Sequence, residues 1–296
     1  MNYREVITTF SCQGEHLVGI VAQPDEPAAT GVVVIVGGPQ YRAGSHRQFV
    51  LLSRALAANG FAVLRFDYRG MGDSEGELRD FEAVNQDVGA AIEALQAAVP
   101  QVEQVALWGL CDGASAALLY CGETADPRVA GLCLLNPWVR SEASLARTQV
   151  KHYYTQRLLQ REFWVKLMRG GVALKALASL ASNVRVALLG AQSSSKNALA
   201  ANPSGRTATP YQARMAQAWN AFGGSICLIL SGDDYTAKEF LEYLGREETW
   251  RRALNHPRLE RQDLPNADHT FSERSDRLHV ESLTNGWLSA SFTSIP

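Results

Sequence analysis

Residues 105–120 decide the fold, and they read Val105-Ala-Leu-Trp-Gly109-Leu-Cys111-Asp-Gly113-Ala-Ser-Ala-Ala-Leu-Leu-Tyr120. The apolar run to Gly109 predicts a strand, and the small residues from Ala114 predict a helix. Glycines on both sides of Cys111 are what a strained strand-to-helix turn requires, because a Cβ there would strike neighbouring backbone. Such a turn would lift the Cys111 sulfur above the sheet edge. The N–H of Asp112 would then be one oxyanion donor, and the helix dipole would favour a thiolate.

The same turn would also suit a purely structural role. A free cysteine in a βα turn is often simply buried, because free Cys is among the most buried residue types. The Asp112 carboxylate suits a helix start, yet a charge beside Cys111 would raise the pKa of the thiol. The nucleophile hypothesis for Cys111 therefore depends on partners elsewhere in the chain.

Strands alternate with helices on both sides of the turn. Residues 31–36 form a continuous β-branched run, which is typical of a strand covered on both faces, and a helix over 45–58 follows. Strands at 61–66 and 129–135 and a helix over about 81–98 continue the pattern. This spacing predicts an α/β fold with a mostly parallel, doubly wound sheet and helices on both faces. Its ligand site should lie at the carboxyl ends of the strands.

The alternation stops at residue 137 and resumes with a strand at 226–230. Residues 137–225 carry twelve Lys and Arg against two acids, a net charge of 12 − 2 = +10, and the remainder carries 16 − 28 = −12. We therefore expect residues 1–136 and 226–296 to form the core and 137–225 to be a basic helical cap. The Ser-, Ala-, Asn-, Gly- and Pro-rich stretch 192–210 is expected to be mobile.

A thiol nucleophile needs a base, and the base needs an orienting group. In this architecture the chain order is nucleophile, acid, histidine. Asp233 and Asp234 follow the strand 226–230, and His269 follows a strand at 259–264. We predict His269 as general base and Asp234 as its orienter, with Asp233 as the alternative. Taken separately, a histidine in a polar loop is often a surface residue, and an aspartate after a strand is often a helix cap.

The second oxyanion donor should come from the turn after the strand that ends at residue 36. Pro39 has no N–H, so Gly38 or Gln40 must supply the donor, and we favour Gln40.

Composition limits the other possibilities. Five widely spaced cysteines without C-x-x-C indicate a reducing cytoplasm, and the scattered histidines predict no metal. Gly70-x-Gly72-x-x-x-Gly76 has the wrong spacing for a dinucleotide fingerprint, so no cofactor is expected. The N-terminus has no apolar signal-like region, and no uncharged apolar run reaches 18 residues. No nucleic-acid partner is expected, and the oligomeric state stays open.

The sequence resembles the α/β-hydrolase superfamily over essentially its whole length, through the elbow and through Asp67-Tyr-Arg-Gly70-Met-Gly72-Asp-Ser74. More narrowly, four segments are similar to the type-1 exosortase A system-associated hydrolases: 37–49, Gly109-Leu-Cys-Asp-Gly113, Leu135-Asn-Pro-Trp138 and Ser231-Gly-Asp-Asp-Tyr-Thr-Ala237. That resemblance implies a bacterial protein encoded among genes for exopolysaccharide production and envelope protein sorting. A Cys nucleophile is similar to that of dienelactone hydrolases. The chain departs from the superfamily at Gly37-Gly38, where a His-Gly pair is common.

The leading hypothesis is hydrolysis of an ester or thioester by Cys111, His269 and Asp234. The substrate would be a small or carrier-bound acyl group, and the basic cap suggests that it is anionic unless that charge is merely solvated. One alternative is an acyltransferase. Another is a non-catalytic docking or membrane-surface module, with peripheral membrane contact through the cap. A peptidase of the proline-iminopeptidase kind is a further option.

Overall fold

The computed structural model describes residues 2–38, 40–140 and 209–293. The chain divides into two compact units, Met1–Val139 with Pro210–Pro296, and Arg140–Thr209. Residues 141–208 hold most of the predicted cap and most of the stretch 192–210, and they lie outside the described residues. The cap and the mobility of that stretch therefore stay predictions.

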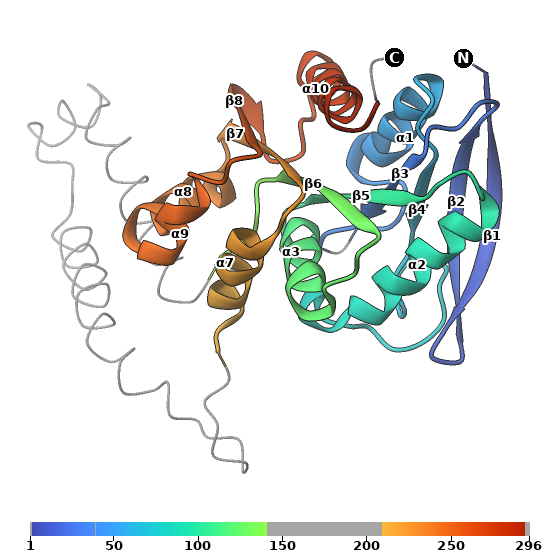
Figure 1. Ribbon diagram of the computed structural model, residues 1–296, viewed down its shortest axis with the longest axis horizontal. Helices are drawn as coiled ribbons and strands as arrows, with labels where there is room; N and C mark the ends of the chain where they lie inside the picture. Colours follow the sequence, from blue (N-terminus) through green and yellow to red (C-terminus); the bar gives the residue numbers. More distant parts are fainter. Residues whose placement is uncertain (1, 39, 141–208, 294–296) are drawn as a thin grey trace, which may run out of the picture. The chain divides into compact units, whose positions relative to one another are not determined.

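The first unit contains an eight-stranded sheet in the order β1-β2-β4-β3-β5-β6-β7-β8 (Figure 1). Its strands are β1 Tyr3–Cys12, β2 Glu15–Pro24, β3 Thr30–Ile35, β4 Val63–Phe66, β5 Gln104–Leu110, β6 Val129–Leu135, β7 Ser225–Asp233 and β8 Leu259–Asp268. Pairing is antiparallel between β1 and β2 and between β2 and β4, and parallel in the other pairs. The chain begins its parallel strands in the middle at β3, moves out to β4 and then returns through β5. The predicted mostly parallel, doubly wound sheet is confirmed.

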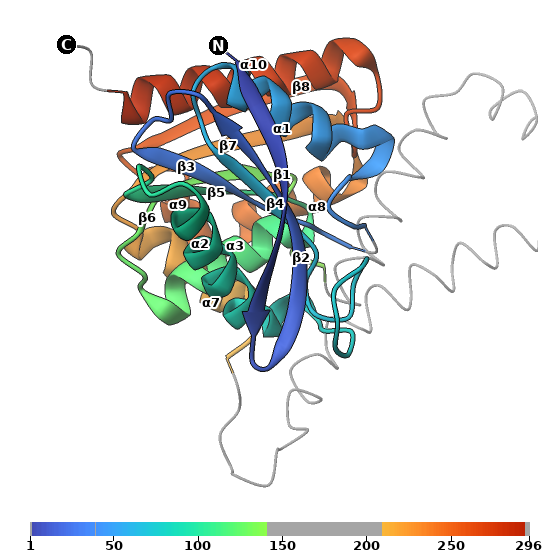
Figure 2. The same cartoon turned by 90° about the vertical axis from the view of Figure 1, so that its right-hand side faces the viewer.

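Helices cover both faces of this sheet, as Figures 1 and 2 show from two directions. One face carries α1 and α10, and the other carries α2, α3 and α7, with α8 and α9 continuing the same core. The bounds are α1 Gln48–Ala58, α2 Asn85–Ala98, α3 Asp112–Thr124, α7 Tyr211–Ala221, α8 Tyr235–Arg246, α9 Glu248–Ala253 and α10 Arg274–Phe292, with 3-10 turns η1 Ser45–Arg47 and η2 Phe81–Ala83. The helix predicted over 81–98 is thus interrupted after η2.

Strand β3 shows why the sheet is covered twice. Val33 and Ile35 point into the core beneath α2 and α3, whereas Val32 and Val34 point into the core beneath α1 and α10. All four side chains are fully buried, as the continuous apolar run predicted. Removing each of these side chains from water contributes roughly 1.5–3 kcal/mol, so the strand anchors the turn that follows it.

Helix α7 corrects the predicted domain boundary. The sequence placed residues 211–221 in the cap, which was expected to end at 225, but the structure places them in the unit that holds the sheet. Trp219 on α7 is fully buried, donates to the Ala253 carbonyl at 2.9 Å, and packs edge-on against Trp250 of α9. A Cβ on Gly122 of α3 would strike Ala218 of α7, so the two helices approach closely. The helix expected to end the cap is instead part of the core.

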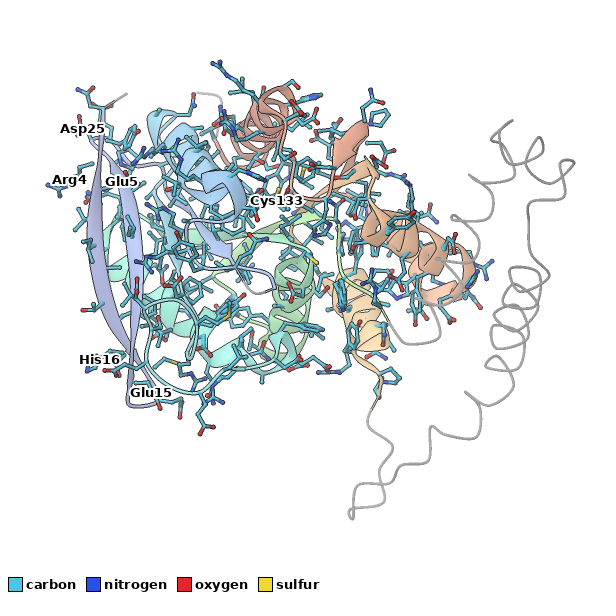
Figure 3. All side chains as sticks on the ribbon, turned by 180° about the vertical axis from the view of Figure 1, so that it is seen from behind. Arg4, Glu5, Glu15, His16, Asp25 and Cys133 are labelled. Carbon is cyan, nitrogen blue, oxygen red and sulfur yellow. The ribbon has the colours of Figure 1, made fainter. Side chains whose placement is uncertain are left out.

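The antiparallel hairpin β1–β2 is held to the sheet by charge as well as by pairing. Glu5 on β1 lies beside α1 (Figure 3). Its two oxygens accept from Arg54 of α1 at 2.6 Å and from Arg65 of β4 at 2.9 Å. This hairpin lies at the opposite edge of the sheet from β8. The candidate site is built by residues that follow strands β5 to β8.

Candidate functional site

Cys111 occupies a strained turn between β5 and α3. Its φ of 62° and ψ of −125° lie in a region that L-residues rarely adopt. A Cβ on Gly109 would strike the backbone of Gly113, and a Cβ on Gly113 would strike the Ile35 carbonyl of β3. Both elbow glycines therefore permit the close approach of strand, turn and helix that their positions in the sequence predicted.

The backbone of Cys111 is fixed on both sides. Its N–H donates to the Leu135 carbonyl at the end of β6 at 2.9 Å, and its carbonyl accepts from Trp138 N–H at 3.2 Å. The other four cysteines differ in their surroundings. Cys12, Cys133 and Cys227 are buried, with Cys133 in the middle of the sheet (Figure 3), and burial raises the pKa of Cys121 to about 12. Cys111 and Cys121 are both half-buried, but the raised pKa of Cys121 disfavours its thiolate, and Cys111 is the one that occupies the strained turn at the end of β5.

His269 is hydrogen-bonded to Asp234, with 2.9 Å between Nδ1 and Oδ2. Asp234 also caps α8, where it accepts from the N–H groups of Thr236 and Ala237 at 3.0 Å each. Burial raises the pKa of the Asp234 carboxyl, but the hydrogen bonds from His269 and the two N–H groups outweigh it, so its pKa lies below the ordinary value. The carboxylate is thus held charged against the imidazole ring.

Asp233, the alternative acid, points elsewhere. Its side chain is 78% exposed and its nearest described cation is Lys238, at 3.8 Å. The side chain of Asp234 is 6% exposed. Of the two acids, Asp234 is therefore the one in contact with His269.

Hydrogen bonds from Asn136 and Ser231 fix the backbone at His269 and Asp268. The sequence interpretation gave neither residue a role. Asn136 follows β6 with a φ of 45°, and its Nδ2 donates to Ser231 Oγ at 2.9 Å and to the His269 carbonyl at 3.2 Å. Ser231 N–H donates back to Asn136 Oδ1 at 2.8 Å, and Ser231 Oγ donates to the Asp268 carbonyl at 2.8 Å. A buried amide thus joins the ends of β6, β7 and β8. An Asn directly after a buried strand was the signal that could have revealed it.

The three candidate residues share one edge of the sheet. Cys111 follows β5, Asp234 follows β7 and His269 follows β8, all at the carboxyl ends of neighbouring parallel strands. Consecutive residues connect them: Leu135 accepts from the Cys111 N–H, and Asn136 donates to the His269 carbonyl. Ligand sites of open α/β sheets lie at this edge. The arrangement can support proton transfer through His269 next to a thiol.

The oxyanion side of the site is built by the turn after β3. Gly38 N–H donates to Asp112 Oδ1 at 2.5 Å, so Gly38 reaches the start of α3. The side chain of Gln40 binds elsewhere, because its Oε1 accepts from Ser45 N–H at 3.1 Å and from Gln48 Nε2 at 3.4 Å. The geometry therefore favours Gly38 over Gln40 as the residue beside Asp112. Either one's role as a donor stays a prediction.

Asp67, in the turn after β4, holds this oxyanion turn in place. Its Oδ1 accepts from Arg42 N–H at 2.6 Å, its Oδ2 is paired with the Arg42 guanidinium, and Oδ2 also accepts from Asp73 N–H at 3.1 Å. A Cβ on Gly72 would overlap the Asp67 carboxylate. The glycines of this segment thus admit a buried carboxylate, and Asp67 joins two loops that the sequence had only flagged as motifs.

Three further observations concern ligands and surroundings. In the part of the chain that the structure describes, no group of three or more His, Cys, Asp or Glu is placed to hold a metal ion. Within the same residues, no helix is both long and apolar enough to cross a membrane. A cavity of about 640 Å³ lies at the opposite edge of the sheet, where Gln104, Val129 and Ser225 begin their strands. That cavity is therefore separate from the Cys111 site.

Comparison with known proteins identifies the family and the fold. The family model described as serine aminopeptidase, S33, matches residues 27–210, more than half of the chain. The human protein ABHD12B is 32% identical over 144 residues, which are 45% of this chain and 39% of that protein. This chain therefore matches well under half the length of that relative.

Two solved structures show the same fold. The Pyrococcus furiosus esterase Pf2001 matches with a TM-score of 0.64 at 14% identity, over 98% of this chain and 92% of that one. XC6422 from Xanthomonas campestris, described as an α/β serine hydrolase without lid, matches with a TM-score of 0.57 at 14% identity, over 100% and 99%. Such identities speak to the fold alone, and the predicted α/β-hydrolase fold is confirmed. Together with the family match, they show that this chain is a member of the α/β-fold hydrolase family described as serine aminopeptidase, S33.

Proposed function

We propose that this chain hydrolyses an ester or thioester bond with Cys111 as nucleophile, His269 as general base and then acid, and Asp234 as the orienting carboxylate. The observation that carries the proposal is the 2.9 Å bond from His269 Nδ1 to Asp234 Oδ2 at the sheet edge where Cys111 sits on its strained turn. Nucleophile, base and orienter in this order and at one edge are the requirements for acyl transfer.

In the first half of the reaction, His269 Nε2 takes the proton from Cys111 Sγ as the sulfur attacks the substrate carbonyl carbon. The C=O π electrons move to the oxygen, which accepts hydrogen bonds from backbone N–H groups at the start of α3 and in the turn after β3. The intermediate collapses and expels an alkoxide or thiolate, which takes the proton from His269. Cys111 is then acylated. Asp234 stabilises the imidazolium throughout and keeps the proton on Nδ1.

In the second half, a water molecule gives a proton to His269 Nε2 and attacks the thioester carbonyl carbon. Collapse of this second intermediate breaks the C–S bond and releases the carboxylic acid, and Cys111 regains its proton from His269. An alcohol in place of water would make the chain an acyltransferase. The chemistry of Cys111 would be the same, so the acceptor is decided by what reaches the acyl-enzyme.

Esters and thioesters are favoured over peptides for a chemical reason. A thiolate leaves from the tetrahedral intermediate with little protonation, whereas an amine must be protonated as it leaves. The family description as serine aminopeptidase points to peptide cleavage as the competing outcome, and an amide substrate belongs in the test for that reason.

The charge of the chain suggests an anionic substrate or carrier. Residues 137–225 have a net charge of +10 against −12 for the remainder. A basic surface attracts anionic acyl carriers, CoA thioesters, polysaccharides or lipid head groups, and it does so less at high salt. Hydrolysis of an acyl-CoA that weakens between low and high salt, while hydrolysis of a neutral ester does not, would support this. Equal salt dependence would favour a merely solvated basic surface.

The setting of the reaction is proposed from the motif resemblance. The segments 37–49, 109–113, 135–138 and 231–237 are similar to exosortase A system-associated hydrolases, and this supports a cytoplasmic role in bacterial exopolysaccharide or envelope biosynthesis.

The test is a screen of p-nitrophenyl esters and acyl-CoA thioesters of graded chain length, plus aminoacyl p-nitroanilides, on wild type, Cys111→Ala and Cys121→Ala. We expect ester or thioester turnover in wild type and Cys121→Ala and its loss in Cys111→Ala. Anilide turnover that exceeds ester turnover would make the chain a peptidase. No turnover, no alkylation of Cys111 and binding to anionic liposomes would favour a docking module.

A further inference from the structure

The N–H groups that an acyl-transfer intermediate needs are already occupied in this structure. The Asp112 carboxylate accepts from the N–H of Gly38 at 2.5 Å. The N–H groups of Asp112 itself and of Gly113 lie near enough to the same carboxylate to lower its pKa. One anionic group therefore gathers the donors of the α3 N-terminus and of the turn after β3, which are the two places from which an oxyanion would be stabilised.

The space for this carboxylate is provided by a glycine. A Cβ on Gly37 would strike Asp112 Oδ1 and the Leu110 carbonyl, whereas a Cβ on Gly38 would meet no atom within 4 Å. The backbone at residue 37 thus lies directly against the Asp112 side chain. Gly37 and Asp112 form a matched pair, in which any larger residue at 37 would displace the carboxylate from its donors.

Resting on the function proposed above, we propose that the Asp112 carboxylate fills the oxyanion hole of the free enzyme and competes with the substrate oxygen. Acyl transfer then requires the Asp112 side chain to leave the N–H groups of Gly38, Asp112 and Gly113. Asp112 would be a specificity-determining residue: only substrates whose binding displaces the carboxylate are turned over. Simple activated esters, which bind through few contacts, would be turned over by the wild type more slowly than by a variant that lacks this carboxylate.

The physical balance supports such displacement. Hydrogen bonds to a charged acceptor are stronger than neutral ones, and the dipole of the 13-residue helix α3 favours an anion at its start. Burial acts in the opposite direction and raises the pKa of the Asp112 carboxyl above the ordinary value, despite the three N–H donors. Asp80 raises this pKa further. The buried phenol of Tyr68 donates to the Val36 carbonyl at 2.6 Å, and burial together with the nearby Asp112 charge raises the pKa of that phenol. The hydrogen bonds hold the carboxylate in place, but burial offsets part of the stabilisation that they give to its charged form.

The kinetic test compares wild type, Asp112→Asn and Asp112→Ala, with Asp25→Asn as a control that removes one exposed negative charge just after β2. Each is assayed with p-nitrophenyl acetate and with the aliphatic aldehyde whose chain matches the best ester. The aldehyde adds to Cys111 as a hemithioacetal, whose oxygen must enter the hole. We expect both Asp112 variants to raise kcat/KM for the acetate and tighten aldehyde inhibition, by about tenfold or more. Asp25→Asn should leave both within about twofold.

A second readout is independent of turnover. In wild type, the amide proton of Gly38 should shift with pH as Asp112 ionises, and in Asp112→Asn this step should disappear. Lower activity and weaker aldehyde binding in both Asp112 variants would overturn the proposal, as would a Gly38 amide that does not titrate. Turnover that persists in Cys111→Ala would refute Cys111 as the nucleophile, whatever the Asp112 variants show. Loss of turnover in Cys111→Ala, with no gain in the Asp112 variants, would overturn only the role of Asp112.

Discussion

Asp234→Asn is the substitution for which the structure gives the most definite expectation. Asp234 Oδ2 accepts from His269 Nδ1 at 2.9 Å and from Ala237 N–H at 3.0 Å, and Oδ1 accepts from Thr236 N–H at 3.0 Å. An asparagine has one oxygen for these three donors. With its oxygen in the Oδ2 position it keeps His269 and Ala237, and its NH₂ then faces the Thr236 N–H. The opposite orientation loses two bonds, so we expect the first.

The magnitude follows from this count. One buried N–H without an acceptor costs about 1–3 kcal/mol of unfolding free energy. Catalysis should suffer more than stability, because the imidazolium at His269 loses its negative partner, although the Asn oxygen still accepts from Nδ1–H and keeps the ring in the same tautomer. The corresponding losses in triads lie at roughly 10²–10⁴ in kcat. KM should change little, since Asp234 does not touch the substrate.

Asp233→Asn is the matched control, because it removes the same charge one residue away. Its side chain is 78% exposed and 3.8 Å from Lys238, so we expect a stability change within about 0.5 kcal/mol and kcat within about twofold. Urea unfolding and steady-state hydrolysis of the best p-nitrophenyl ester measure both effects. If Asp234→Asn kept wild-type kcat, or if Asp233→Asn lost as much, the assignment of Asp234 as orienter would be wrong.

Three other expectations follow from the same contacts. Asn136→Ala should destabilise the fold by about 2–4 kcal/mol and lower kcat by displacing His269, which thermal melts and ester kinetics would show; an unchanged melt would refute it. Gly37→Ala should lower the melting temperature, because its Cβ would strike the Leu110 carbonyl; a wild-type melt would contradict this. The pKa of Asp234 is depressed in the fold, so its stabilisation is present above the ordinary carboxyl pKa and is lost as pH falls through the folded pKa. Urea unfolding between pH 7 and 3 should therefore show the gap between wild type and Asp234→Asn closing toward acid, and a constant gap would argue against the linkage.

The fold was largely predictable because its signals are local. The β-branched run 31–36 and the glycines around Cys111 depend only on neighbouring residues, and the structure contains the expected strand and turn there. The extent of the core was harder to predict. The apolar face of α7 fits a cap helix as well as a core helix, and only its contact with α3 and Trp250 distinguishes them.

The site shows the same division. Residues at strand ends could be listed from the sequence, but the choice between Asp233 and Asp234 depends on which side chain points inward after β7. Asn136 binds Ser231, 95 positions away, and His269, 133 positions away, and no local pattern encodes such contacts. The Gly38–Asp112 bond likewise joins residues 74 positions apart, which is why the sequence could not show that Gly38, and not the favoured Gln40, lies beside Asp112.

The most direct measurement is the mass of the enzyme quenched during turnover of its best p-nitrophenyl ester, followed by peptide mapping. If a thiol on the strained turn is acylated with help from His269, one acyl group per chain will be found on Cys111. The adduct and the turnover will both be absent in Cys111→Ala. Turnover without any adduct on Cys111, or an equal rate in Cys111→Ala, would contradict the account.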